Sequence, residues 1–182
     1  MSITIAKWTI EQYHKLVDTG MLIDRRVELL SGDIIEMSPE GMFHAVYCGD
    51  AVDYLKQLLG NRAKVREAHP ITLPNDSEPE PDIAVVMPAT HRYLEHHPYP
   101  ADIFWLIEYA DSTLTKDLNT KQQIYAAAGI QEYWIVNLQA LELIIFRGIS
   151  NMGYELETRL SIGNISPLSF PDLNIDIRRL FS

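Results

Sequence analysis

Apolar residues recur along the chain in two patterns, one with helical spacing and one of short continuous runs. Helical spacing over 9–20 predicts a helix that Gly20 closes. A second amphipathic stripe over 43–60 predicts a longer helix with Gly60 at its end. Residues 116–129, KDLNTKQQIYAAAG, predict a third helix.

The continuous apolar runs predict strands. Three of them, at 82–86, 103–108 and 132–136, contain few polar residues and are typical of strands in the middle of a sheet that is covered on both faces. Two shorter runs within 27–36 flank Ser31-Gly32-Asp33, which predicts a β-hairpin. Further extended segments are expected at 63–74 with a bend at Pro70, at 141–147, at 153–160, and, as a short helix or an extended segment, at 170–181.

The order of these elements predicts the fold class. A helix, a hairpin, a helix, several strands, a helix and several more strands favour an α/β fold with a mixed sheet flanked by helices. The 182 residues are enough to bury a core, and the chain has neither an internal repeat nor a linker. We therefore expect a single domain over 1–182.

Composition narrows the classes of function. No apolar run approaches the roughly 20 residues of a membrane-spanning helix, and the first residues lack a signal-peptide pattern, so a cytoplasmic location is expected. Cys48 is the one cysteine, which excludes an intrachain disulfide and a cysteine-based zinc cluster. We expect it to be a small core residue.

The net charge of −10 bears on nucleic-acid binding. Phosphate contacts need Lys and Arg, so this balance argues against a broad basic surface that grips nucleic acid. It is compatible with an enzyme that contacts a phosphodiester through a metal ion and a few local cations.

Lys121 lies in the middle of an apolar stripe on the third helix. The stripe consists of Leu118, Ile124, Tyr125 and Ala128. One interpretation is an i,i+4 pair with Asp117, in which the lysine extends from a partly buried face toward water. The other is an ammonium directed into a pocket, where it stabilises a phosphate or helps to activate water. Both remain open at this point.

Two carboxylates stand at the ends of apolar strands. Glu108 follows a run of five apolar residues, and alternation puts it on the same face as Leu106 and Phe104. A carboxylate there needs a cation, a metal ion or solvent at the strand end. Asp82 opens the preceding apolar run. Together they offer the hard oxygen ligands that Mg²⁺ takes, completed by water and a substrate phosphate.

His44 and Glu28 have two interpretations each, and a histidine pair has one. We favour a hydrogen-bonded core-edge role for His44, which lies on the stripe of the second helix, over a role in a site. Glu28, inside the hairpin, is either a solvated carboxylate or a third acidic member of the site. His96 and His97 lie in a loop bounded by prolines, and we interpret them as surface residues.

Several segments, in this order, resemble the Uma family of restriction-endonuclease-like proteins within the PD-(D/E)XK nuclease superfamily. They are VELLSGDIIEMSP, SEPEPDIAVV, IEYADSTLTKDLNTKQQIYAAAGIQEYWIVN and LELIIFR, and the resemblance covers about 27–147. It implies a restriction-endonuclease-like core, a mixed central β-sheet flanked by α-helices, with a divalent-metal site at one end.

The resemblance also assigns roles to residues. It implies that Asp82 belongs to the PD element, that Glu108 is the acidic member of the second element, and that both hold Mg²⁺ or Mn²⁺. The chain departs from the superfamily pattern at Ala110, where a lysine is usual, and the family's lysine matches Lys121 on the following helix. Tyr109 is bulkier than the usual residue, which predicts a narrower cleft. Glu28, His44 and Asp117 are supporting residues.

The leading hypothesis is a metal-dependent endodeoxyribonuclease with Asp82, Glu108 and Lys121 as catalytic residues. DNA is its expected substrate, and a homodimer is plausible because cleavage of both strands of a duplex commonly uses two sites. The alternative is a non-catalytic interaction module that keeps the nuclease fold. The charge of −10 and the missing E-x-K spacing favour that alternative.

Overall fold

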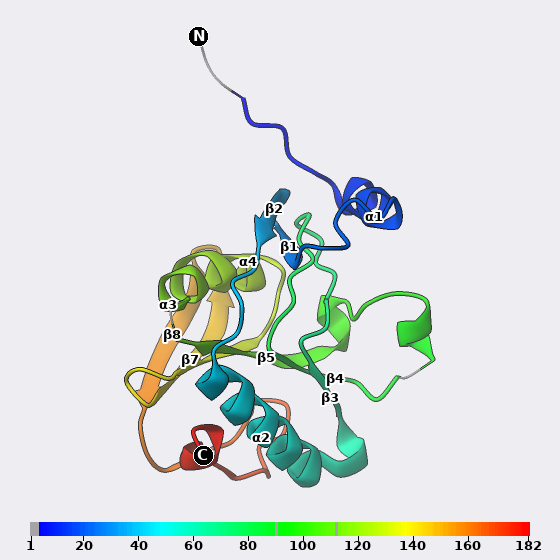
Figure 1. Cartoon of the computed structure of the whole chain (residues 1–182). Helices are drawn as coiled ribbons and strands as arrows, with labels where there is room; N and C mark the ends of the chain where they lie inside the picture. The colour runs from blue at the N-terminus through cyan, green and yellow to red at the C-terminus, as the bar shows by residue number, and fades with distance from the viewer. Residues whose placement is uncertain (1–3, 90, 112) are drawn as a thin grey trace.

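A six-stranded mixed sheet forms the centre of the molecule (Figure 1). The computed structural model describes residues 4–89, 91–111 and 113–182. Strands β5 and β6 are parallel, and the other neighbours are antiparallel. The spatial order is β3 (Lys64–Glu67), β4 (Ile83–Val86), β5 (Ile103–Ala110), β6 (Glu132–Asn137), β7 (Glu142–Ser150) and β8 (Gly153–Leu160). The predicted mixed α/β fold is confirmed.

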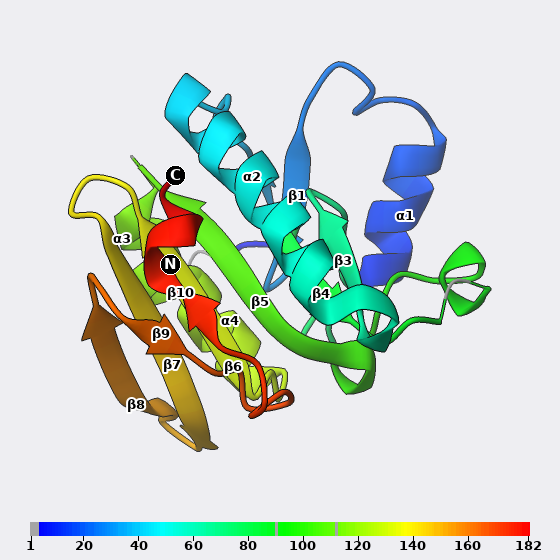
Figure 2. The same cartoon turned by 90° about the horizontal axis from the view of Figure 1, so that it is seen from below.

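Helices cover both faces of this sheet (Figures 1 and 2). One face carries α2 (Met42–Leu59) and the C-terminal segment, which comprises β9 (Asn164–Ile165), β10 (Ile175–Asp176) and the short helix η5 (Ile177–Leu180). The other face carries one continuous helical segment made of α3 (Leu114–Lys116), η4 (Asp117–Lys121) and α4 (Gln122–Ala127). Short 3₁₀ turns occur at η1 (Gly60–Arg62), η2 (Arg92–Leu94) and η3 (Pro100–Asp102).

The central strands contain continuous apolar runs because helices cover both faces of the sheet. On β5, Trp105 and Ile107 pack toward α2, whereas Leu106 packs toward α4. All three side chains are fully buried. A strand covered on both faces has no solvent side for a polar residue, so both alternating sets of side chains are apolar.

A β-bulge corrects one sequence-based assignment. Strand β4 pairs Val85 with Trp105 and then Val86 with Ile103, which leaves Phe104 as an extra residue on β5. Phe104 therefore packs on the α2 side, and not on the face of Leu106 as strict alternation predicts. A bulge adds one residue to one strand and so reverses the alternation beyond it.

The predicted hairpin forms from β1 (Val27–Leu30) and β2 (Asp33–Glu36). Asp33, assigned to the turn from the sequence, pairs with Leu30, so the turn has two residues. Ser31 and Gly32 both have positive φ, at 48° and 79°. This is the arrangement of a type I′ turn, whose twist matches the flanking strands. A Cβ at Gly32 would lie 2.8 Å from the Cβ of Lys7, so the position also needs the absence of a side chain.

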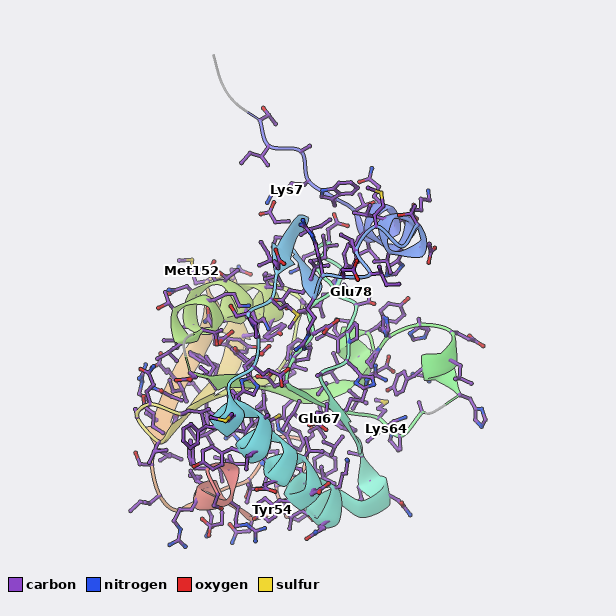
Figure 3. The ribbon with its side chains drawn as sticks, viewed as in Figure 1. Lys7, Tyr54, Lys64, Glu67, Glu78 and Met152 are labelled. Atoms are coloured by element: carbon purple, nitrogen blue, oxygen red, sulfur yellow. The ribbon has the colours of Figure 1, made fainter. Side chains whose placement is uncertain are left out.

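The hairpin connects the N-terminal helix α1 (Ile10–Asp18) to the sheet. The Tyr13 hydroxyl of α1 donates to the Val27 carbonyl at 3.1 Å. On the other side, Leu29 bridges to Glu78, which lies next to the hairpin in Figure 3. Residue 28 is thereby held over the end of the central sheet.

The C-terminal segment is attached to the core by two tyrosines. The buried Tyr109 hydroxyl donates to the Leu180 carbonyl at 3.1 Å. Tyr54, labelled on α2 in Figure 3, accepts from the Asp176 backbone N–H at 3.0 Å. The tail expected from the sequence as a helix or an extended segment contains both, β10 followed by η5. Among the helices of the described residues, none combines the length and apolarity needed to span a bilayer.

Replacing Tyr109 by Phe tests how much the Leu180 contact contributes. The Y109F variant keeps the ring in the core but leaves a buried carbonyl without its donor, so the free energy of unfolding should fall by about 1–2 kcal/mol. Urea denaturation measures it. Y47F is the control, because Tyr47 is only half-buried and its ring packs at the edge of the same core. Equal stability of Y109F and wild type would contradict the assignment.

Candidate active site

A cavity of about 200 Å³ opens where the first turn of α2, the end of β5 and the η4 turn meet. Asp82, Glu108 and Lys121, the three residues predicted as catalytic, all line it. His44 and Asp117 line it as well. The structure therefore brings together residues from four separate elements.

Strand register places the two carboxylates side by side. Ile83 of β4 pairs with Ile107 of β5, so the next position along puts Asp82 opposite Glu108. The Oδ2 atom of Asp82 accepts a hydrogen bond from the Tyr109 backbone N–H at 2.6 Å. Its Oδ1 atom lies 3.1 Å from Nε2 of His44. Asp82 is thus oriented by one backbone and one side-chain contact.

The surroundings of His44 favour its protonated form. Burial alone lowers its pKa, but the hydrogen bond and the charge of Asp82 raise it by more, so the net pKa is above the usual value. The core-edge interpretation is thus incomplete, because the imidazole contacts Asp82 at the cavity wall. Through this contact His44 orients the Asp82 carboxylate.

Glu108 is a buried carboxylate with two donors. Its Oε1 atom accepts from Lys121 Nζ at 2.8 Å and from the Tyr125 hydroxyl at 2.7 Å. Burial raises the pKa of Glu108 to about 8; Lys121 lowers it, while Asp82 and other acidic neighbours raise it further. The negative charge at this position is therefore costly without an additional cation.

Lys121 lies on a turn of π-helix. Residues 117–121 follow the α3 turn, and the Gln122 N–H donates to the Asp117 carbonyl, an i→i+5 bond. In a regular α-helix Lys116 and Lys121 would stand about 140° apart. The wider turn brings them to one side, where both contact the same carboxylate. π-turns inside helices are frequent at functional sites.

That carboxylate is Glu28 of the hairpin. It has no exposed surface, and its oxygens lie 3.0 Å from Lys116 Nζ and 3.4 Å from Lys121 Nζ. It also accepts from the Glu80 backbone N–H at 3.4 Å. Burial alone would raise the pKa of Glu28, but the two lysines lower it by more. Of the two interpretations, the solvated carboxylate is wrong, and Glu28 belongs to the acidic cluster.

Asp117 was one possible partner of Lys121, through an i,i+4 ion pair. The i,i+4 ion pair with Lys121 does not form; Asp117 instead accepts from the Thr113 hydroxyl at 2.7 Å, and Lys121 pairs with Glu28 and Glu108. The π-turn is the reason, because it rotates residue 121 away from the position that an α-helix gives i+4. Burial raises the pKa of Asp117, and Lys121 opposes that rise through space.

The donor set fits a divalent cation of the magnesium type. Asp82 and Glu108 supply hard carboxylate oxygens, and each ionised carboxylate offers about four acceptor positions, so their present hydrogen bonds leave capacity. Among the described residues no group of three His, Cys, Asp or Glu side chains is arranged to hold an ion by itself. Mg²⁺ is commonly held by one or two carboxylates with waters and substrate phosphates, so two suffice.

The comparison with family models decides the classification. The model described as "Uma2: Putative restriction endonuclease" matches residues 10–178. The chain belongs to the Uma2 family. The match extends beyond the resemblance over 27–147 at both ends and takes in α1 and most of the C-terminal segment. Comparison with curated proteins gave no match.

A solved structure has the same fold as this Uma2 protein. It is described as a "putative nuclease belonging to DUF820 from Anabaena variabilis ATCC 29413". The TM-score is 0.74 at 17% sequence identity, with 95% of this chain and 97% of that chain covered. At this identity the likeness shows the fold.

Lys116 and Tyr125 contact the cluster but were missed from the sequence. Tyr125 was assigned to the apolar stripe, and its ring is indeed buried, but its hydroxyl donates to Glu108. Lys116 was hidden by the helical wheel, which assumes regular α-helix. No pattern in the sequence marks the π-turn that brings Lys116 and Lys121 to the same carboxylate.

The other residues singled out in the sequence have side chains in the apolar core or at a different cavity. Ala110, which takes the place of the superfamily's lysine, is fully buried in the core beside α4. The Tyr109 side chain points into the opposite core, and its pKa is well above the usual value because of burial. Cys48 is buried, as expected, and burial raises the pKa of its thiol. His96 and His97 are half-buried in their loop and line a different cavity, away from the predicted catalytic residues.

Replacing Glu108 by Gln should flatten the dependence of stability on pH. A carboxyl whose folded pKa is raised stabilises the fold below its unfolded pKa, and that stability is lost as the pH rises to about 8. Without metal, the wild-type free energy of unfolding should therefore fall relative to E108Q between pH 5 and 8, by at most about 1.4 kcal/mol per pH unit. Urea midpoints in EDTA measure this difference, and parallel profiles would contradict it.

Replacing Glu28 by Gln should destabilise the fold strongly. The change leaves Lys116 and Lys121 without their shared anion, and breaking a buried ion pair costs about 3–5 kcal/mol. E36Q is the matched control, because Glu36 lies on the same hairpin and is exposed. Chemical denaturation at pH 7 compares the two variants. A loss no larger than that of E36Q would show that Glu28 does not hold the lysines.

Proposed function

We propose that this Uma2 protein is a metal-dependent endonuclease that hydrolyses DNA phosphodiester bonds at the cavity between α2, β5 and η4. One observation carries the proposal: two carboxylates from adjacent strands and a buried lysine line the same small cavity. Membership of a family described as "Putative restriction endonuclease" agrees with it.

Asp82 and Glu108 would hold Mg²⁺ or Mn²⁺. Charge balance supports this, because Glu28, Glu108, Asp117 and Asp82 face the two lysines and His44, and the raised pKa of Glu108 reflects its burial and this surplus of acid. A divalent cation, when bound, supplies Lewis acidity toward a phosphoryl oxygen and a water molecule.

The chain's own residues would orient the Asp82 carboxylate and stabilise the charge that builds on the phosphoryl oxygens. His44 and the Tyr109 N–H fix the direction of the Asp82 carboxylate. Lys121 places an ammonium beside Glu108, where it offsets negative charge that builds on the phosphoryl oxygens during attack by water. The carboxylates around Lys121 raise its pKa despite its burial, so the ammonium is charged at neutral pH.

Glu28 and Lys116 are assigned supporting roles. Glu28 forms ion pairs with both lysines. Lys116 is partly exposed, and its side chain lines the cavity. Lys116 is therefore a candidate to contact a second phosphate oxygen of the substrate. The single domain over 1–182, the cytoplasmic location and the homodimer stay predictions from the sequence.

A cleavage assay on plasmid and single-stranded DNA with Mg²⁺ or Mn²⁺ tests the proposal. D82N, E108Q and K121M should each lower the rate by roughly 100-fold or more, the size of effect seen when one charged catalytic contact is removed. E155Q is the control, since Glu155 is exposed on β8. Calorimetry with Mg²⁺ should give weaker binding for D82N than for wild type.

Two outcomes would overturn the proposal. Wild type that leaves both DNA substrates intact with either metal would favour the non-catalytic interaction module. Metal binding of undiminished strength in D82N would exclude Asp82 as a ligand. Circular dichroism of each variant separates lost activity from lost folding.

A further inference from the structure

The first turns of α2 expose apolar side chains next to the cavity. Met42, Phe43 and Val46 are 83%, 67% and 57% exposed. The Phe43 ring stacks on Tyr47, with ring centroids 6.1 Å apart and an interplanar angle of 27°. We call Met42, Phe43, Val46 and Tyr47 the rim patch. Its centre is an exposed, flat aromatic surface.

The rim patch and the cavity share one turn of helix. Gly41 and His44 line the cavity, while Phe43 between them points to solvent. In Figures 1 and 2 the start of α2 lies beside the end of β5 that carries Glu108. One helical turn rises about 5.4 Å, so a nucleotide next to a phosphate held in the cavity is within reach of the patch.

The charges of the site limit what phosphate contacts can supply. The cations that line the cavity are each paired with a carboxylate: Arg26 with Glu40 at 2.8 Å, Lys116 with Glu28, and Lys121 with Glu108. The chain as a whole carries −10. Affinity for a closed duplex comes mainly from phosphate contacts, and here the free positive charge for them is small.

Base stacking does not depend on that charge. Each base presents a π face once it is unpaired, and aromatic side chains bind such faces without regard to sequence. In a closed duplex these faces are covered by the neighbouring base pairs. The exposed Phe43 ring, stacked on the half-buried Tyr47 beside the cavity, therefore suits an unpaired strand better than a duplex.

We propose that the rim patch stacks a base of the nucleotide that flanks the phosphate in the cavity, so that the site takes single-stranded or locally unpaired DNA in preference to closed duplex. This inference rests on the proposed function and specifies its substrate class. A second copy of this chain is the other occupant to be distinguished, because an exposed apolar helix face also suits a protein interface.

Fluorescence anisotropy with a labelled 12-nucleotide oligothymidylate and with a labelled 12-base-pair duplex tests it, in EDTA so that cleavage plays no part. Wild type should bind the single strand more tightly. F43A should weaken that binding by roughly 5- to 150-fold, as expected for the loss of one stacked base, and should leave duplex binding unchanged.

Matched variants separate stacking from apolar contact. F43W keeps a π face and should bind as wild type does, whereas F43L keeps apolar area without a π face and should behave as F43A does. L94A is the control for loss of an exposed apolar side chain, since Leu94 is 81% exposed on η2. Thermal unfolding of each variant verifies the fold.

The inference is overturned if wild type binds neither probe, if F43L binds as well as wild type, or if both probes bind equally. It is also overturned if sedimentation shows a wild-type dimer that F43A dissociates with unchanged DNA affinity, since the patch then belongs to a protein interface. If wild type cleaves duplex DNA and F43A cleaves and binds equally well, this inference is wrong and the proposed function stands. If binding of the single strand depends on Phe43 but no DNA is cleaved, the inference stands and the proposed function is wrong.

Discussion

The site depends on one buried ammonium that is surrounded by more carboxylate than it can neutralise. Lys121 has almost no exposed surface, and its Nζ atom pairs with Glu28 at 3.4 Å and Glu108 at 2.8 Å. A buried ion pair stabilises a fold only when its geometry and hydrogen bonds offset the cost of dehydration. Here the acid is in excess, so the arrangement is stable with a proton on one carboxyl group or with an added cation. A divalent cation bound at Asp82 and Glu108, as proposed, would compensate this excess of acid.

Three separate elements bring this buried lysine and the surrounding carboxylates together. The β1–β2 hairpin delivers Glu28, β5 delivers Glu108, and the helical segment after β5 delivers Lys121 through a π-turn. Other side chains of each element pack in apolar clusters, which fixes the position of the element. Functional sites commonly concentrate such unfavourable groups, and the surrounding packing provides the stability that they cost.

Under the proposed function, the same excess of acid would limit how the protein binds nucleic acid. Cations at the cavity are committed to carboxylates, so an approaching phosphate must compete with Glu28 and Glu40 for Lys116 and Arg26. A bound divalent ion would change that balance by occupying the carboxylates. Uncharged contacts, such as the stacking proposed for Phe43, would contribute a larger share of the binding free energy on an acidic chain than on a basic one.

Local patterns in the sequence determined the order of the elements and the mixed sheet, and they placed Lys121 on an apolar stripe, because apolar periodicity reflects which faces are covered. Family motifs pointed to Asp82 and Glu108. Tertiary structure alone decided the partners of Lys121, since Glu28 lies 93 positions away in the chain and neither a helical wheel nor alternation relates the two. It also decided the bulge at Phe104 and the π-turn before Gln122. Both are departures from regular geometry, imposed where strands and helices must fit each other, and regular periodicity cannot express them.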